Sequence, residues 1–399
     1  MRILLANDGF GDAGGVQQYL DAVAEGLLAR GHRLAVMHRD PMGGPARVSR
    51  AIAELPQFSV AAGFDAAMHS AATWKPDVCF SHNMDQLAVD RRLAAIAPVV
   101  KFMHAYSGTC ISGLKRHAFP RACTCDRVFG PACAVLFLPR RCGRLSVSLL
   151  TSQYRHAREQ RDLFSTYQAI VVASHHMARE YERNGADAAR VHVNPLFPTC
   201  PPVATPCAPG ATLTVAFMAR MTPLKGGDVL IRAAALASRR LSRPMSLTLV
   251  GDGPVRPEWE ALARRLGVPA VFSGWQDGAT RFDLVRRADL LAMPSTWPEP
   301  FGLAGLEAAA LGVPAVAFDV GGVREWLRPG INGWLADANP PTADALAATL
   351  VEALGDRDRL TAMRARALDV AGELSLARHL DRLEALLASG NEGVTWRRA

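Results

Sequence analysis

The sequence of 399 residues has no run of ~18 uncharged apolar residues, the length that a membrane-spanning helix needs. The apolar stretch after Met1 stops at Asn7, which makes it too short for a secretory signal peptide. We therefore expect a cytoplasmic protein, either free or at the inner face of the membrane.

One common phosphate-binding loop is also missing, because the sequence has no Gly-Lys-Ser/Thr motif. A glycine-rich stretch from Asp8 to Val16 follows the first expected strand, and Gly9, Gly11 and Gly14 within it have the spacing Gly-x-Gly-x-x-Gly. Alone, such a glycine-rich turn is weak evidence for a binding site. Its position still matters, because ligands of doubly wound folds bind at the carboxyl ends of strands.

Length and composition indicate two folded domains. Single hydrophobic cores stop growing near ~250–300 residues, and 49% of this longer chain is hydrophobic. Short apolar runs alternate with helical stretches, as in parallel sheets joined by crossover helices. We expect an α/β protein with two doubly wound domains, at residues 1–195 and 212–372. A proline-rich linker at 196–211 joins them, a helix at 373–390 follows, and a polar tail at 391–399 is expected to be disordered.

The expected elements alternate in the same way in both halves. In the first half, strands are expected at residues 2–7, 33–38, 77–81, 99–104, 169–174 and 191–194. In the second half, they are expected at 212–219, 246–251, 270–272, 289–293, 314–319 and 333–335. Helices are expected at 16–30, 343–354, 357–371 and 376–388, and the last of these could cross back onto the first domain. Two such domains place a cleft between the carboxyl ends of their sheets.

Positive charge is concentrated in one segment. The formal net charge is +8, and residues 101–161 hold eleven Lys or Arg against two acids, a local charge of +9. One interpretation is a solvated helical face with a loop; the other is a docking surface for anionic lipid headgroups or a phosphorylated acceptor. Nucleic acid is not an expected partner, because aromatic residues are not interleaved with these charges as base stacking requires.

The most informative motif runs from Glu299 to Glu307, with one carboxylate on either side of an expected helix start. Gly302 allows a tight turn and a close approach of the backbone to a ligand. The helix that begins at Leu303 would point its free amides into the cleft, where they favour phosphate. The carboxylates would then bind the hydroxyl groups of a ribose and a sugar. The alternative is a surface helix with two solvated glutamates.

A second motif follows the strand expected at 212–219. Arg220 and Lys225 lie five residues apart at a strand-to-helix turn, and Gly227 or Asp228 is expected to cap the helix. Both cations and the positive end of that helix would converge on one point, where a diphosphate is the natural ligand. The alternative is an ordinary basic surface loop.

His104 ends the fourth expected strand at the ligand-binding edge of the first sheet. A single histidine is often structural, but this position also suits a functional role.

Together these motifs resemble the retaining glycosyltransferase family 4, which has the GT-B fold. The resemblance covers most of the chain and depends on an ordered set: Gly14-Gly15-Val16, Arg30-Gly31-His32, His104, Val171 to Ser174, Arg220 with Lys225-Gly226, Val250 to Pro254, Pro294-Ser295, Glu299 to Glu307, Gly321-Gly322 and Asn332-Gly333.

The resemblance implies a role for each matched residue. Arg220 and Lys225 would hold the donor diphosphate and stabilise its developing charge. Glu307 would bind the ribose, and His104 would contact the donor sugar near its reacting carbon. The other implied donor contacts are Gly14, Gly15, Gly253, Glu299, Phe301, Gly302 and Leu303.

The resemblance also implies how the reaction runs. The catalytic set would be His104, Arg220, Lys225 and Glu299. Since the sequence shows no evident covalent nucleophile, this set suits a front-face mechanism that needs neither metal nor cofactor. The donor would be a nucleotide-diphosphate sugar and the acceptor an unidentified glycan, lipid-linked or small molecule of cell-surface glycan or related biosynthesis.

A cysteine-rich segment at residues 105–165 departs from the family pattern. Its five cysteines, Cys110, Cys123, Cys125, Cys133 and Cys142, lack Cys-x-x-Cys pairing. A structural zinc site, disulfides and separate buried thiols are all compatible with this spacing. The apolar run from Ala132 to Leu138 predicts either a packing helix or a membrane contact.

Two other functions remain compatible with the expected fold. A nucleotide-sugar epimerase would share the architecture but needs carboxylates placed for proton transfer. A non-catalytic sugar-binding subunit would share the fold, and loss of Arg220, Lys225 or Glu307 would indicate it; all three are present.

Overall fold

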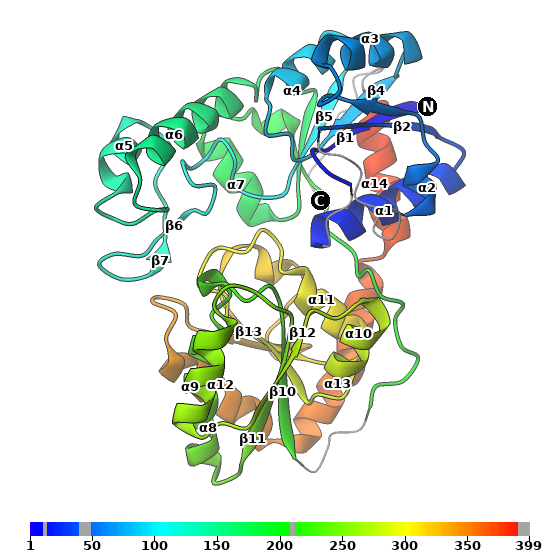
Figure 1. The fold of residues 1–399 in the computed structure, drawn as a ribbon. Helices are drawn as coiled ribbons and strands as arrows, with labels where there is room; N and C mark the ends of the chain where they lie inside the picture. The colour runs from blue at the N-terminus through cyan, green and yellow to red at the C-terminus, as the bar shows by residue number, and fades with distance from the viewer. Residues whose placement is uncertain (11–13, 40–48, 208–211, 390–399) are drawn as a thin grey trace.

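Two parallel-sheet domains, stacked one above the other in Figure 1, make up the protein. The computed structural model describes residues 1–10, 14–39, 49–207 and 212–389. The tail expected at 391–399 lies outside the described residues, as do parts of the glycine-rich stretch and of the linker.

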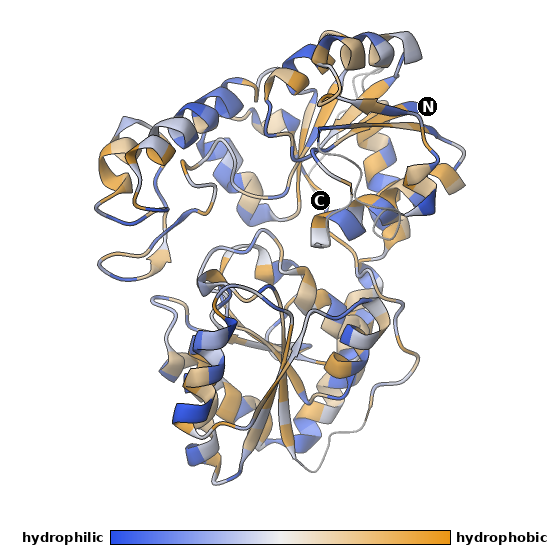
Figure 2. Cartoon of the chain, viewed as in Figure 1, coloured by the Kyte–Doolittle hydropathy of each residue, from blue (hydrophilic) through white to orange (hydrophobic). Residues whose placement is uncertain are grey.

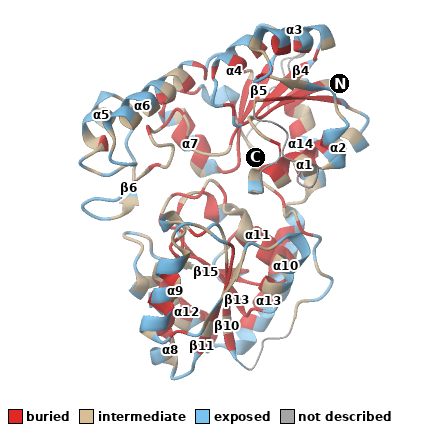
Figure 3. Cartoon of the chain, in the orientation of Figure 1, coloured by how far each residue is buried: buried red, intermediate tan, exposed pale blue. Residues whose placement is uncertain are grey.

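The first domain contains a parallel sheet with the order β3-β2-β1-β4-β5-β8-β9. Its strands are β1 (Arg2–Ala6), β2 (Arg33–His38), β3 (Gln57–Ser59), β4 (Val78–Ser81), β5 (Val99–Met103), β8 (Ala169–Val172) and β9 (Val191–Val193). Most strand positions are buried (Figure 3), because helices cover both faces of such a sheet. The strands expected from the sequence lie within two residues of these bounds, but β3 was not expected.

Helices and one short 3-10 turn connect these strands. They are α1 (Gly15–Ala29), α2 (Arg50–Ala53), α3 (Phe64–Trp74), α4 (Ala88–Leu93), α5 (Pro131–Phe137), α6 (Val147–Asp162), α7 (His175–Arg183) and η1 (Ala188–Arg190). α1 ends before Gly31, whose φ of 83° is the left-handed conformation that stops a helix. Among the described residues no helix is long and apolar enough to cross a membrane.

The second domain contains a six-stranded sheet with the order β12-β11-β10-β13-β14-β15. Its strands are β10 (Leu213–Met218), β11 (Met245–Val250), β12 (Ala270–Gly274), β13 (Leu290–Met293), β14 (Ala315–Phe318) and β15 (Gly333–Ala336). Around them lie η2 (Pro223–Lys225), α8 (Gly227–Leu241), α9 (Arg256–Leu266), α10 (Gly278–Arg286), α11 (Leu303–Ala310), η3 (Gly321–Glu325), α12 (Ala343–Gly355) and α13 (Arg357–Glu373). Figure 2 shows that the strands of both sheets are largely hydrophobic, whereas the surrounding helices also carry many hydrophilic residues. Most of the hydrophobic strand residues are buried.

The last helix, α14 (Leu376–Ala388), packs on the first domain rather than on the second. Arg30 at the end of α1 forms ion pairs with Asp381 at 2.7 Å and with Glu384 at 2.5 Å. Leu380 lies so close to Gly26 that a Cβ on this glycine would be 2.4 Å from Leu380 Cδ1. The chain therefore crosses between the domains twice.

The cysteine-rich segment forms a separate lobe on the first domain, at the left of Figure 1. It contains a short antiparallel hairpin, β6 (Arg116–His117) and β7 (Cys123–Thr124), followed by α5 and α6. Its own core is small: the fully buried residues are Ile111, Phe129, Phe137 and Ala157. So small a core contributes little stability by itself, and the lobe depends on its attachment to the domain.

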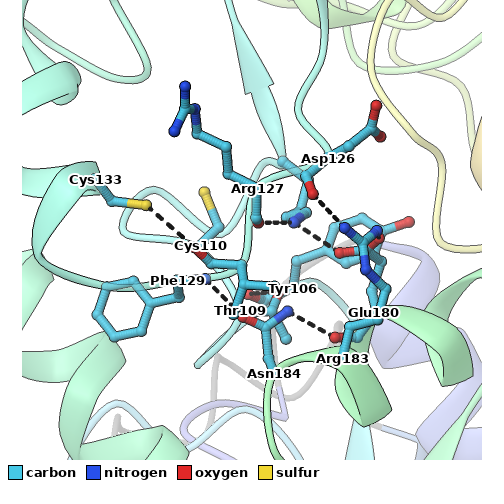
Figure 4. A network of polar contacts seen from close by, with 12 residues as sticks. Tyr106, Thr109, Cys110, Asp126, Arg127, Phe129, Cys133, Glu180, Arg183 and Asn184 are labelled. Carbon is cyan, nitrogen blue, oxygen red and sulfur yellow. Dashed lines mark hydrogen bonds and ion pairs between the residues drawn. The ribbon is translucent and has the colours of Figure 1, made fainter.

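Polar contacts attach this lobe to α7 (Figure 4). Lys115 Nζ lies 2.6 Å from a carboxylate oxygen of Glu180, and both side chains are buried. Arg183 donates to the carbonyl of Asp126, and Asn184 accepts a hydrogen bond from the Phe129 amide at 2.8 Å. A buried ion pair left with one partner is strongly destabilising, so these contacts fix the position of the lobe.

The five cysteines of the lobe do not form one cluster. Cys123 Sγ lies 3.2 Å from His117 Nε2, across the hairpin from it. Burial, and secondarily the nearby thiols of Cys110, Cys125 and Cys133, raise the pKa of Cys142 to about 11. All five are free thiols, and no three metal-binding side chains of the described residues are grouped to hold a metal ion. The zinc interpretation therefore finds no support in this structure.

Candidate active site in the cleft between the domains

A pocket of about 250 Å³ lies between the domains, at the carboxyl ends of the second sheet. The first domain contributes Gly14, Gly15 and Gln18, and the second domain contributes most of the lining. Its polar side chains include three cations and two carboxylates: Arg220, Lys225, Arg281, Glu299 and Glu307. The pocket therefore joins both motifs that the sequence singled out.

The turn after β10 positions Arg220 and Lys225. Gly226 follows with a φ of 66°, and a Cβ at this position would lie 2.0 Å from the carbonyl oxygen of Pro294. Only glycine fits here, so the turn packs directly on the loop that carries Glu299. The N-cap of α8 is Gly226 itself, without a side-chain cap, and the expected cap by Gly227 or Asp228 is wrong. Both of these residues lie inside the first turn of the helix.

Glu299 is almost fully buried and accepts several hydrogen bonds on one oxygen. Lys225 Nζ lies 2.7 Å from Glu299 Oε1, and Trp297 Nε1 donates to the same oxygen at 3.0 Å. Ser295 donates to it as well. A buried carboxylate held in this way is fixed in orientation, and it fixes Lys225 in turn.

Gly302 caps α11 in the left-handed conformation, with a φ of 87°. A Cβ here would lie 2.7 Å from the Met293 side chain, so the tight turn requires glycine. The first amides of α11 face the pocket through Gly302, Leu303 and Ala304, which line it. The expected anion-favouring helix start is therefore present.

Glu307 lies one turn further along α11 and also lines the pocket. It is buried, and this desolvation raises its pKa despite the opposing effect of Arg281. Thr199 donates a hydrogen bond to it. The sequence analysis did not identify Arg281 or Thr199 as neighbours of this carboxylate.

Arg281 on α10 connects the two domains across the pocket. Its Nη2 donates to Gln18 Oε1 of α1 at 2.8 Å and lies 3.4 Å from Glu307 Oε1. Nothing in the sequence marks either Gln18 or Arg281, because each belongs to an ordinary amphipathic helix. Only the packing of α1 against α10 reveals them.

The first domain contacts the pocket mainly through the backbone of Gly14 and Gly15, at the start of α1. A Cβ on Gly15 would lie 4.0 Å from Leu303, so the start of α1 faces the start of α11 directly. Gly14 and Gly15 both line the pocket, and neither places a side chain in it.

His104 is not among the residues that line the pocket; it is partly exposed and lies in an aromatic cluster at the end of β5. Its Nε2 lies 2.9 Å from His82 Nδ1, and its ring stacks on Phe102. Tyr19 packs against both histidines and lies within hydrogen-bonding distance of His379 Nε2 in α14, at 3.0 Å. Burial lowers the pKa of His104 to about 3, so this ring is neutral at physiological pH. His82 and His379 were not anticipated.

Two expected donor contacts lie behind the pocket lining. Gly253 packs on the loop of Arg220, where a Cβ would lie 2.3 Å from the Met221 carbonyl oxygen. Phe301 is buried, and its carbonyl accepts a hydrogen bond from Trp326 Nε1 at 2.8 Å. Both residues support the turns that form the pocket. Trp275 and Gln276 do line it, and Trp275 is half exposed, although neither was expected.

The arrangement of these sheets and their cleft is the GT-B fold of glycosyltransferases. Anabaena Alr3699/HepE, solved in complex with UDP and glucose, superposes with a TM-score of 0.69 over 97% of this chain and 99% of that chain, at 18% identity. Residues 208–369, which include most of the second domain, match the family described as glycosyl transferases group 1.

Curated relatives are similar over less than half of this chain. A D-inositol 3-phosphate glycosyltransferase of Nocardia farcinica is 41% identical over 180 residues, which are 43% of this chain and 39% of the relative. One from Thermobispora bispora is 35% identical over 197 residues, 47% of this chain and 45% of the relative. The chain thus spans less than half the length of these relatives.

Proposed function

We propose that the chain is a retaining glycosyltransferase that uses a nucleotide-diphosphate sugar as donor. The observation that carries this proposal is a single pocket lined by Arg220, Lys225, the start of α11 and two buried carboxylates. Cations and helix amides favour a diphosphate, while Glu299 and Glu307 suit the hydroxyl groups on either side of it.

Each part of the donor would contact a different group of residues in the cleft. Glu307 would accept hydrogen bonds from the ribose, and Arg220 and Lys225 would hold the diphosphate. Glu299 and the backbone at Gly302 would hold the sugar. Trp275, half exposed at the rim, offers an aromatic face for the base.

Catalysis would come from preorganised charge. Negative charge develops on the diphosphate as the glycosidic bond breaks, and Lys225 is already fixed beside that position by Glu299. Since Glu299 is engaged by Lys225, Ser295 and Trp297, it is poorly placed to attack as a nucleophile. This favours a front-face reaction in which the leaving phosphate takes the acceptor proton. Positive charge from side chains and helix amides lets the reaction proceed without a metal ion.

On the acceptor side we propose contact between the lobe and an anionic membrane surface. Large apolar residues are exposed there among basic ones: Phe119, Val128, Val135, Leu145 and Val147 are each at least 50% exposed. Exposed apolar side chains beside arginines suit the interface of a bilayer with anionic headgroups. The acceptor would then be presented at that surface.

The same geometry disfavours an epimerase. Epimerisation needs an acid–base carboxylate free to move a proton, whereas Glu299 is paired with Lys225 and Glu307 with Arg281.

The test is donor hydrolysis without acceptor, screened across nucleotide sugars with and without a chelator. We expect one nucleotide-sugar class to be hydrolysed slowly, with retention of anomeric configuration and no effect of the chelator. Tight UDP or GDP binding without turnover on any donor would instead indicate a non-catalytic sugar-binding subunit. Inverted product would refute the retaining mechanism.

A further inference from the structure

Arg116 reaches from the lobe across the cleft to the second domain. It belongs to β6, and its Nε donates to the carbonyl of Thr296 at 3.0 Å. The neighbour of Thr296 in sequence, Ser295, lines the donor pocket and donates to Glu299. The guanidinium therefore lies near the end of the pocket assigned to the sugar, where an acceptor must enter.

Among the residues that the structure describes, no carboxylate forms an ion pair with Arg116. Its only hydrogen bond within those residues uses Nε, which leaves both terminal nitrogens available to a ligand. The side chain is partly buried, and this desolvation lowers its pKa. The carboxylate of Asp228 opposes this lowering of the Arg116 pKa but forms no ion pair with Arg116. A partly buried, unpaired cation favours the arrival of an anion.

A second arginine, Arg140, is held at the same hairpin as Arg116. His117, the next residue, is largely buried, and its pKa is lowered by desolvation, by Arg140 and by Arg116 itself. The amides of Ala118 and Phe119 both donate to the Arg140 carbonyl, which holds that arginine against the hairpin. An anion bound here would relieve repulsion between like charges.

The hairpin is positioned before any ligand binds. Lys115, adjacent to Arg116, has a left-handed φ of 47° and is tied to Glu180 and to the carbonyl of Arg127, at 2.6 Å each. These contacts belong to the network that joins the lobe to α7 (Figure 4). A side chain that is already ordered loses little entropy on binding.

We propose that Arg116, with Arg140 held at the same hairpin, binds a phosphate group carried by the acceptor. A guanidinium with two free terminal nitrogens matches the oxygens of a phosphate monoester in a bidentate manner. The inference rests on the proposed function, since it assigns the acceptor class of the same cleft. The phosphate can belong to a soluble acceptor or to a lipid, and both share this chemistry.

Binding of glycerol 3-phosphate, a soluble phosphate monoester, tests the site by calorimetric titration of the full chain. Arg116→Gln should weaken this binding about tenfold or more, the usual effect of losing a charge-assisted pair. Arg121→Gln is the matched control, because it removes the same charge from the exposed loop of the same hairpin. We expect it to change the affinity less than about twofold.

A second arm uses phosphatidylcholine vesicles that contain phosphatidic acid, which carries the same headgroup on a lipid. Loss of vesicle binding in Arg116→Gln but not in Arg121→Gln, without glycerol 3-phosphate binding, would assign the phosphate to a lipid. Glycerol 3-phosphate binding that depends on Arg116 would assign it to a soluble acceptor. The proposal would be overturned if Arg116→Gln and Arg121→Gln changed the binding of glycerol 3-phosphate and of vesicles equally, or if neither variant changed either.

UDP binding separates this inference from the proposed function. Both variants should bind UDP as the wild type does. A fall in UDP affinity in Arg116→Gln would mean that Arg116 serves the donor diphosphate and would overturn the acceptor assignment. Absence of UDP, GDP and other nucleotide binding in the wild type would refute the proposed function, whatever the phosphate result.

Discussion

Lys225 Nζ lies 2.7 Å from Glu299 Oε1, and this pair connects the two motifs that line the donor pocket. Gly226 makes the pair possible, because its turn packs against the carbonyl of Pro294 with no room for a side chain. The two residues are 74 positions apart in sequence, so neither motif alone reveals that each orients the other.

Lys225→Ala should lower turnover by about a hundredfold or more, because it removes fixed positive charge beside the leaving diphosphate. Arg220→Ala should act in the same direction. Steady-state kinetics with the hydrolysed donor would measure both effects. Arg232→Ala, on the exposed face of α8, is the control and should retain full activity. Near-normal turnover in the Lys225 variant would contradict the proposal that Lys225 binds the donor diphosphate.

Glu307→Gln should mainly raise the KM for donor, because ribose contacts change little during the reaction. Burial raises the pKa of Glu307 above the ordinary 4.5, and its ionised form is the one that accepts from two hydroxyls. Donor affinity of the wild type should therefore fall as pH is lowered through that raised pKa, at a higher pH than for an exposed glutamate. The variant should lack this transition. A variant whose kcat collapsed at unchanged KM would contradict the ribose role.

Arg140, Arg141 and Arg144 changed together to Gln should weaken binding to anionic vesicles in a flotation assay. A contribution of about 1 kcal/mol per basic residue makes the loss measurable, and added salt should imitate it. Donor hydrolysis without acceptor should be unaffected. A control triple of Arg232, Arg264 and Arg265, exposed on the second domain, should leave vesicle binding unchanged. If the wild type does not bind such vesicles, the proposed membrane contact is wrong, and the apolar and basic surface of the lobe simply faces solvent.

The buried histidines should make the first domain sensitive to acid. Burial lowers the pKa of His104 to about 3 and that of His379 to about 4, against 6.5 ordinarily. The unfolded chain therefore binds protons below pH 6.5 that the folded chain excludes, so stability is lost as pH falls below 6.5. Each histidine contributes a slope of about 1.4 kcal/mol per pH unit in that window.

Denaturant titrations between pH 4 and 8 would measure this slope. His379→Gln should reduce it, while His69→Gln, on the exposed face of α3, should not. An unchanged slope in the His379 variant would show that this ring is protonated in the folded protein.

The sequence predicted the main strands well because buried parallel strands are nearly continuous apolar runs. It missed β3, a three-residue edge strand, Gln57–Ser59, with no such run. It also placed the cap of α8 at Gly227 or Asp228, since the left-handed turn at Gly226 depends on packing against Pro294. Local patterns carry no information about such long-range contacts.

The candidate site was predictable where chemistry lay in a local motif, as for Lys225 and Glu307. Gln18 and Arg281 meet only because α1 and α10 face each other across the cleft, 263 positions apart. His104 had a clear position at a strand end, but its partners His82 and Tyr19 come from other parts of the chain. Its contact with the donor sugar remains a prediction.

The two crossings of the chain between the domains define how the cleft can open. One passes near Thr199, which hydrogen-bonds Gln18 in the first domain and Glu307 in the second. The other passes through Leu374 and Ser375, just before α14 returns to the first domain. Two tethers permit rotation about the line that joins them and resist twisting or sliding. Closure over a donor would thus follow a single axis, with Glu307 near the hinge and Arg116 at the moving rim.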